Sequence, residues 1–226
     1  TIKKFNFGFR AAQGGTPEDY SMEVHDINGT QVGEEISNLS PNSAIKQGFA
    51  LVTEERRATG IFGILDIRAN TVIANLKNYK LGKFPLLSDA KMARDTDRMI
   101  EAMHIKTPSQ RQQIKNLSGG NQQKVIFGRW MLTNPDVLLL DDPTRGIDVG
   151  AKYEIYELIQ SLAKQGKSII MISSEMSEII GMSNRVMVMC DGRITGFING
   201  KDATQENIMA LATQFETAPD AAAANQ

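Results

Sequence analysis

The sequence predicts an α/β fold with a mostly parallel sheet, a helical subdomain and a small antiparallel β region. Two runs in the second half, around residues 136–140 and 168–172, are continuously apolar, as strands buried on both faces are. Amphipathic helical patterns alternate with these runs, which is typical of α/β architectures. A long helical pattern between Ile67 and Met103 predicts the helical subdomain.

The first third of the chain is weakly specified. Residues 1–45 are rich in Gly, Asn, Ser and Pro, and an alternating run at 20–24 precedes Asn28-Gly29, a hairpin-turn signal, so we expect a small β region. Residues 49–53 predict a strand that runs directly into charged residues 54–57. Gly82 and Pro85 interrupt the helical pattern that follows.

The second half predicts a regular order of elements. We expect a helix after residues 118–120 that continues through Met131, a strand at 136–140, a helix at 151–165 and a strand at 168–172. A helix at about 176–182 and strands at 185–189 and 194–198 should follow. Asp191-Gly192 would turn the last two strands into a hairpin. This order predicts a parallel core with an antiparallel edge.

Composition and charge exclude several classes of protein. Of 226 residues, 41% are hydrophobic and 23% charged, which is ordinary for a globular chain, and the formal net charge of −1 gives no overall attraction to nucleic acid. One cysteine, Cys190, excludes an intramolecular disulfide, and no apolar run is long enough to span a bilayer. Without an initiator Met or a secretory signal, the chain is interpreted as a cytoplasmic piece of a longer protein.

Two carboxylates, Asp141 and Asp142, follow a buried strand. They would lie at the carboxyl edge of the sheet, where ligands of open α/β folds bind. One could hold Mg²⁺ and the other could orient or deprotonate an attacking water. The alternative for this stretch alone is a strand that simply ends in a polar turn.

The stretch KNLSGGNQQK, residues 115–124, precedes a predicted helix. Ser118 can cap that helix, and the backbone amides of Gly119 and Gly120 would lie at its positive end, where phosphate binds. On the glycine pair alone, a capped helix without a ligand is the simpler interpretation. The motifs that follow along the chain change that judgement.

Three motifs occur in a fixed order between residues 117 and 148. Residues 117–123 resemble the signature motif of the ATP-binding-cassette (ABC) family, residues 138–142 its Walker B strand, and residues 146–148 its D-loop. The resemblance implies an ABC-type nucleotide-binding domain. It also implies nucleotide contacts from Ser118, Gly119, Gly120, Gln122 and Asp148, and a Mg²⁺ ligand at Asp141.

Longer segments resemble one branch of this family. LVTEERR, LSGGNQQKV, PTRGIDVGAKYEIY and ISSEM are similar to the second cassette of tandem ATP-binding subunits of bacterial sugar importers, most of all the galactose/methyl-galactoside type. The similarity runs from about Gly48 to Phe215. It implies an ATP hydrolase on the cytoplasmic face of the inner membrane, with ATP and Mg²⁺ as cofactors.

The same resemblance implies the partners. They would be the N-terminal cassette of the same subunit or a second subunit, the transmembrane sugar permease and, indirectly, a periplasmic sugar-binding protein, but no nucleic acid. The apolar residues Ile61, Phe62, Ile64 and Leu65 could form the permease contact, or could equally be packed core. Two alternatives remain open: a non-transport ABC ATPase, and a catalytically silent structural or regulatory fragment.

Several positions depart from an active cassette. The glycine-rich phosphate loop with its lysine is absent from these residues, so the sequence is interpreted as N-terminally truncated. Asp142 stands where the catalytic glutamate is expected, Glu54 at the Q-loop glutamine and Ser174 at the switch histidine. We therefore expect a weak or silent site of its own, and an isolated chain that does not hydrolyse ATP.

The predicted domain plan has four parts. Residues 1–59 form a partial β and core region without the phosphate loop, residues 60–116 the helical subdomain, residues 117–215 the signature helix and α/β core, and residues 216–226 an alanine-containing disordered tail.

Overall fold

A computed structural model describes residues 6–10, 21–25, 36–37, 40–82 and 86–214. The chain divides into two compact units, residues 1–170 and 171–226. Each unit is described by itself. The four-part plan predicted above, with its boundaries at 59, 116 and 215, stays a prediction.

The first unit contains the parallel sheet. Its strands follow the order β4 (Phe49–Val52), β5 (Val137–Asp141) and β6 (Ser168–Ile172), and β6 crosses the boundary between the units. Strands β4 and β5 run parallel, with Ala50 opposite Leu138 and Val52 opposite Leu140. These four side chains are buried, because alternate residues of a strand share one face. The predicted parallel core is confirmed.

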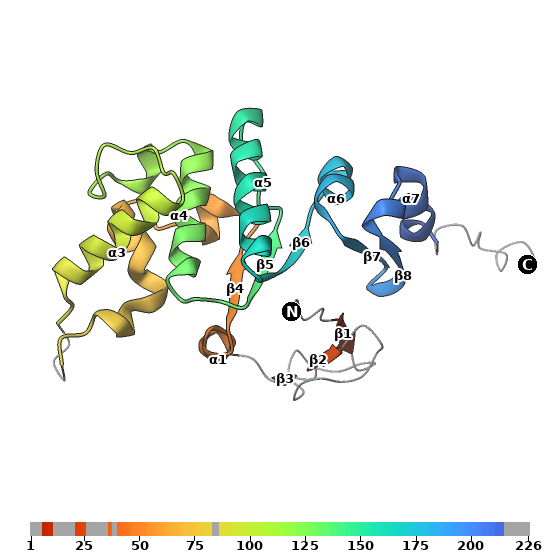
Figure 1. The fold of residues 1–226 in the computed structure, drawn as a ribbon, viewed down its shortest axis with the longest axis horizontal. Coiled ribbons are helices and arrows are strands. Elements are labelled where there is room, and N and C mark those ends of the chain that lie inside the picture. Colours follow the sequence, from red (N-terminus) through yellow and green to blue (C-terminus); the bar gives the residue numbers. More distant parts are fainter. Residues whose placement is uncertain (1–5, 11–20, 26–35, 38–39, 83–85, 215–226) are drawn as a thin grey trace, which may run out of the picture. The chain divides into compact units, whose positions relative to one another are not determined.

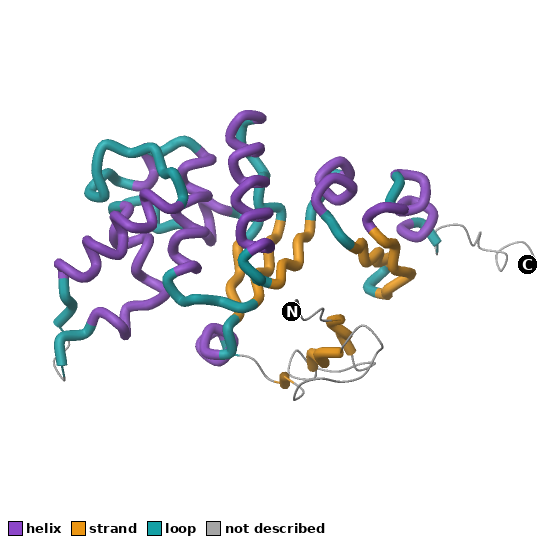
Figure 2. Tube along the Cα trace, in the orientation of Figure 1, coloured by secondary structure: helices purple, strands orange, loops and turns teal. Residues whose placement is uncertain are grey.

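Helices occupy most of the chain between residues 56 and 131 (Figure 2). They are η2 (Arg56–Gly60, a π-helix), α2 (Ile67–Val72), η3 (Ile73–Tyr79), α3 (Asp89–Ala102), η4 (Ile114–Asn116) and α4 (Gly119–Met131). Side chains of Asp66, Ser88 and Ser118 cap α2, α3 and α4. The helices predicted between Ile67 and Met103, and the helix ending at Met131, are present.

A buried arginine ties three of these helices together. Arg129 of α4 is 6% exposed and donates to the carbonyl oxygens of Gly60 (2.7 Å) and Asn70 (2.6 Å), and to Asn70 Oδ1 (3.2 Å). Gly60 ends η2, and Asn70 belongs to α2. Burial lowers the pKa of Arg129 to about 10, so the side chain stays charged at neutral pH.

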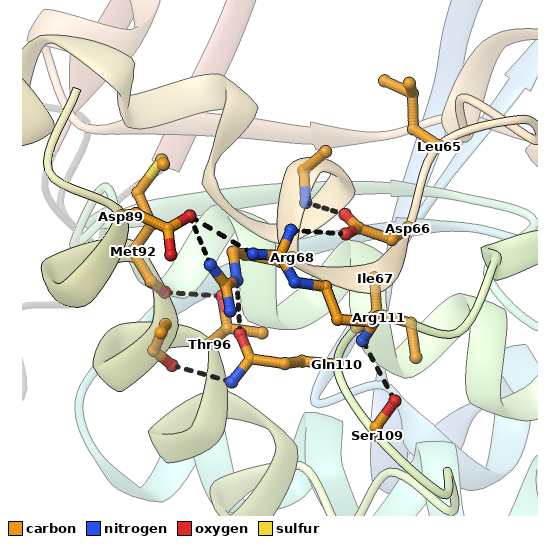
Figure 3. Close-up of polar contacts among 12 residues, drawn as sticks. Leu65, Asp66, Ile67, Arg68, Asp89, Met92, Thr96, Ser109, Gln110 and Arg111 are labelled. Atoms are coloured by element: carbon orange, nitrogen blue, oxygen red, sulfur yellow. Dashed lines mark hydrogen bonds and ion pairs between the residues drawn. The ribbon is translucent and has the colours of Figure 1, made fainter. Parts of the chain in front are cut away.

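A second polar cluster holds α2 against α3 and the loop after it (Figure 3). Arg68 donates to Asp89 Oδ1 (2.5 Å) and to Gln110 Oε1 (2.5 Å). Arg111 pairs with Asp66 at 3.3 Å and with Asp89 at 3.4 Å. Both arginines thus contact carboxylates, and the hydrogen bond from Arg68 lowers the pKa of Asp89.

The segment before α4 lies along the start of α2. The amide of Ile67 donates to Gln112 O (3.0 Å), and the amide of Ile114 donates to Leu65 O (3.1 Å). These main-chain bonds join residues 112–114 to the loop that contains Phe62, Ile64 and Leu65. We call residues 110–114 the strap.

The second unit is a hairpin covered by helices. Strands β7 (Arg185–Cys190) and β8 (Arg193–Asn199) are antiparallel, and Asp191 and Gly192 at the turn have φ of 49° and 72°. Helix α6 (Met176–Met182) precedes the hairpin in the chain, and helix α7 (Gln205–Ala212) follows it and lies beside it in Figure 1. Its core contains Val186, Val188, Ala203 and Ile208.

Four features differ from the sequence expectations. Helix α1 (Pro41–Lys46) lies in the region predicted to be β, because Ser40 caps it and Pro41 occupies its first turn. The π-helix η2 and helix α7 were not predicted. Strands β7 and β8 pair as a two-stranded sheet and not as an edge of the parallel sheet.

The N-terminal β region is confirmed in part. Strands β1 (Asn6–Arg10), β2 (Ser21–His25) and β3 (Ile36–Ser37) form an antiparallel sheet. The predicted Asn28-Gly29 turn and the tail 216–226 lie outside the described residues. Over the part of the chain that is described, no helix has the length and apolar character needed to cross a membrane.

Candidate functional site

The start of α4 leaves one hydroxyl proton without an internal acceptor. Ser118 Oγ accepts from the amide of Asn121 (3.4 Å) and from Asn121 Nδ2 (2.9 Å). A serine hydroxyl offers two acceptor positions and one donor, so both acceptor positions are used. Within the described ranges Ser118 donates to no group, and Lys106 N fixes Asn121 by donating to its Oδ1 (2.7 Å). The Ser118 proton is therefore available to a ligand.

The two glycines that follow Ser118 permit close packing. A Cβ on Gly120 would lie 2.6 Å from Ala151 Cβ of α5 (Val149–Lys164), and a Cβ on Gly119 would lie 3.2 Å from Gly146 O. The first amides of a helix have no partner inside it. The glycines thus allow the positive end of the helix to pack against the loop 144–147. Because glycine has no side chain, nothing of their own covers the amides of Gly119 and Gly120.

Gln122 differs from the expectation that it faces a nucleotide. It is 2% exposed, and its amide nitrogen donates to Ile114 O (3.2 Å) and Leu117 O (3.1 Å). Its Oε1 accepts from Arg56 Nε (3.2 Å). The side chain points inward because it satisfies two carbonyls of the turn before α4. Gln122 thus supports the turn before α4, and its assignment as a nucleotide contact stays a prediction.

Arg56 lies between the helix start and the loop 144–147. Its Nη1 donates to Arg145 O (3.2 Å), and its Nη2 lies 2.9 Å from the position that a Cβ on Gly119 would take. The side chain comes from η2, directly after the charged junction at the end of β4. Burial, with a smaller contribution from Arg57, lowers its pKa.

Glu54 is held by the same loop. It forms an ion pair with Arg145, whose guanidinium also lies 3.8 Å from Glu55. The amide of Arg145 donates to Asp142 O (3.0 Å). The structure therefore brings the predicted Q-loop position together with the turn that carries Asp142.

The two carboxylates end β5 as predicted. Asp141 is its last residue, and Asp142 adopts a left-handed φ of 40°, which Asp tolerates better than most residues do. Among the described residues, no group of three or more His, Cys, Asp and Glu side chains could hold a metal ion. Asp141 and Asp142 could supply at most part of a Mg²⁺ shell, which suits a metal that also binds phosphate oxygens.

The two remaining predicted residues, Asp148 and Ser174, belong to different units. Asp148 caps α5, because its Oδ1 accepts from Ala151 N (3.0 Å). Ser174 belongs to the second unit, where its neighbour Ser173 donates to Glu178 (2.7 Å). Its assignment as the switch position stays a prediction.

Comparison with known proteins identifies the family. The family model described as ABC transporter matches residues 18–145, more than half of the chain. The chain belongs to the ABC transporter family. The chain is also 60% identical over 183 residues to the galactose/methyl galactoside import ATP-binding protein MglA of Clostridium tetani, an overlap of 81% of this chain and 36% of that protein.

Other ABC proteins agree with this placement. The protein of the same description from Escherichia coli K12 is 52% identical over 207 residues, which cover 92% of the chain and 38% of the relative. The chain thus spans little more than a third of the length of these relatives. A nucleotide-free ATP-binding cassette from an ABC transporter has a TM-score of 0.66 at 18% identity, covering 84% of this chain and 73% of the other, which supports the ABC fold.

Three residues of the candidate site could not be singled out from the sequence. Arg56 belongs to a charged junction, Asn121 is one of several polar residues before a helix, and no sequence signal marks Arg145. The partners of Arg56 and Arg145 lie 66 to 91 positions away along the chain and come close only through the fold, whereas the contact of Asn121 with Ser118 is local. The charged residues 54–57, which follow a predicted strand, are the one feature of the sequence that could have pointed to Arg56.

Proposed function

We propose that this chain is part of the ATP-binding subunit of an ABC importer for galactose, methyl galactoside or a related monosaccharide. The observation that carries this proposal is its 60% identity, over most of the chain, to a protein of that description. In the complete subunit the chain supplies the signature half of a composite ATP site. The first cassette, or a second subunit, supplies the phosphate loop.

The start of α4 fits a phosphate group. Ser118 offers a hydroxyl proton that has no acceptor within the described residues, and Gly119 and Gly120 offer main-chain amides at the positive end of the helix. In the proposed site, Ser118 donates to an oxygen of the terminal phosphate while the two amides stabilise its charge. Bound ATP supplies the phosphoanhydride bond whose hydrolysis drives transport.

The cassette's own catalytic positions support weak activity. We assign Asp141 to Mg²⁺ and Asp142 to the place of the catalytic glutamate, where its shorter side chain would position a water less well. Glu54 is occupied by its ion pair with Arg145. Together with Ser174 at the switch position, these residues make this cassette the less active one of the proposed pair. Asp148 caps α5 and so holds the loop that faces the partner cassette in the proposed site.

The loop before α2 provides the proposed permease contact. Phe62 and Leu65 are exposed, Ile64 is 78% exposed, and Ile61 is partly buried. Exposed apolar side chains gathered in one loop are typical of an interaction surface. We place this surface against the transmembrane subunits at the cytoplasmic face of the inner membrane, with a periplasmic sugar-binding protein acting on the other side.

Ser118→Ala tests this function. In the complete subunit reconstituted with its permease, we expect sugar-stimulated ATP hydrolysis to fall about tenfold or more, because a hydrogen bond to a charged group is lost. Ser88→Ala is the matched control, since Ser88 also caps a helix, α3, through Lys91 N (3.3 Å). Equal rates for Ser118→Ala and wild type would contradict the proposed role.

A further inference from the structure

Arg56 is a buried cation beside the proposed phosphate site, and the proposed function assigns it no role. It is 8% exposed, and two of its three guanidinium nitrogens have acceptors: Nε bonds to Gln122 Oε1 and Nη1 bonds to Arg145 O. Both acceptors are neutral. Within the described part of the chain, Nη2 has no acceptor, and it lies 2.9 Å from the Cβ position of Gly119.

The nearby acidic side chains do not neutralise Arg56. Glu54 and Glu55 are directed at Arg145, the former as a close ion pair and the latter at 3.8 Å. Arginine remains protonated throughout the physiological range, even where burial lowers its pKa. A fixed positive charge therefore lies beside Gly119 without a carboxylate partner among the described residues.

The position of this charge is well defined. Gln122 is itself buried and fixed by Ile114 O and Leu117 O, so the guanidinium is held from the α4 side by an oriented amide. Arg145 O holds it from the loop that packs on α4. A planar guanidinium held at two nitrogens is fixed in orientation, which directs the third nitrogen to one place.

We propose that Arg56 is a further binding residue of the signature site, whose Nη2 attracts the terminal phosphate of a nucleoside triphosphate docked at Ser118 and Gly119. The proposal rests on the proposed function. Ser118 and the two glycine amides supply only neutral donors, and Arg56 adds a full positive charge beside this helix start. Gln122 and the carbonyl of Arg145 act as its positioning groups.

The charge should distinguish triphosphate from diphosphate. The experiment compares Arg56→Gln and Arg56→Lys in the complete subunit, with dissociation constants for a non-hydrolysable ATP analogue and for ADP measured by calorimetry. For Arg56→Gln we expect analogue binding to weaken about 10-fold to 100-fold, as for loss of a charged hydrogen bond, and ADP binding to change less than about twofold. Arg56→Lys should retain most of the preference, because it keeps the charge.

Arg57→Gln is the matched control. Arg57 is the exposed neighbour in η2 and makes no hydrogen bond or ion pair within the described residues, so its removal changes the net charge equally. It should leave both dissociation constants within about twofold of wild type. An equal effect of Arg57→Gln and Arg56→Gln would show a general charge effect and overturn the assignment.

Ser118→Ala separates this inference from the proposed function. If Ser118→Ala leaves hydrolysis unchanged, the signature role fails, and the role of Arg56 fails with it. If Ser118→Ala lowers hydrolysis while Arg56→Gln weakens the analogue and ADP alike, or weakens neither, only the Arg56 inference is overturned. A Lys variant as weak as the Gln variant would also overturn it, by showing a packing role.

Discussion

Arg56 and Arg129 are both buried arginines held by neutral acceptors, yet their surroundings differ in one respect. Arg129 has an acceptor at each of its three guanidinium nitrogens, from Gly60 O, Asn70 O and Asn70 Oδ1. Arg56 has acceptors at only two of its three, and the remaining one faces Gly119. Every guanidinium nitrogen of Arg129 thus has an acceptor in the helices that it joins, whereas Nη2 of Arg56 keeps its N–H groups for a ligand.

A third arrangement completes the comparison. In the cluster of Figure 3, Arg68 and Arg111 contact the carboxylates of Asp66 and Asp89, so their charges are largely neutralised. The three arrangements show that burial of an arginine alone does not indicate function. The unused donor and the missing carboxylate together distinguish Arg56.

The largest effect on stability should come from Arg129. Arg129→Leu removes one donor from each of three buried acceptors, of which Asn70 Oδ1 keeps its bond from Phe62 N (2.9 Å). We expect the free energy of unfolding to fall by about 3 kcal/mol. Urea denaturation followed by the fluorescence of Trp130, the single tryptophan of the chain, would measure it. Arg94→Leu, on the exposed side of α3, should cost less than about 0.5 kcal/mol. Similar losses for the two variants would show that the Arg129 bonds add little.

A smaller effect is expected for the support of Arg56. Gln122→Leu removes the side-chain donor to Leu117 O and one of two donors to Ile114 O, which keeps its bond from Leu117 N (3.1 Å). It also releases one side of the guanidinium, so the free energy of unfolding should fall by about 2 kcal/mol. The same denaturation experiment applies, with the exposed Gln165→Leu as its control. A variant as stable as wild type would show that solvent replaces these bonds and that Arg56 is not held as described.

The smallest effect on the free energy of unfolding should appear only at acidic pH. Arg68 lowers the pKa of Asp89 in the folded chain, so the unfolded chain binds more protons at low pH. The stabilisation is complete above the ordinary Asp pKa and is lost as the pH falls through the lowered value. Asp89→Asn should remove this part of the acid dependence and leave the slope at neutral pH unchanged. Identical acid unfolding curves for Asp89→Asn and wild type would contradict the role of this pair, in which Asp89 is exposed and Arg68 is buried.

Much of the fold could be predicted from the sequence because its signals are local. Helix α6 occupies the predicted residues Met176–Met182, and α4 ends at the predicted Met131. Continuous apolar runs identified β5 and β6, since a buried strand shows its pattern over a few residues. Helix α1 was missed because its six residues show no apolar periodicity, and it depends on Ser40 and Pro41 at its start.

The site was only partly predictable. Ser118 caps α4 as expected, because capping requires only residues close together in the chain. The inward orientation of Gln122 could not be inferred, since its partner Arg56 is 66 positions away. The resemblance to a motif indicates the segment at the start of α4, but the motif does not say which of its polar side chains face outward.

The main-chain bonds of the strap, residues 110–114, bear on which substitutions the neighbouring apolar loop can accept in evolution. Its contacts with the apolar loop and the start of α2 include main-chain bonds, as in Ile114 N to Leu65 O and Ile67 N to Gln112 O. Because these bonds use no side-chain atoms, the exposed side chains of Phe62, Ile64 and Leu65 can be exchanged without breaking them. In the proposed permease contact, the side chain of Leu65 would face the partner while its carbonyl oxygen holds the loop to the segment leading into α4.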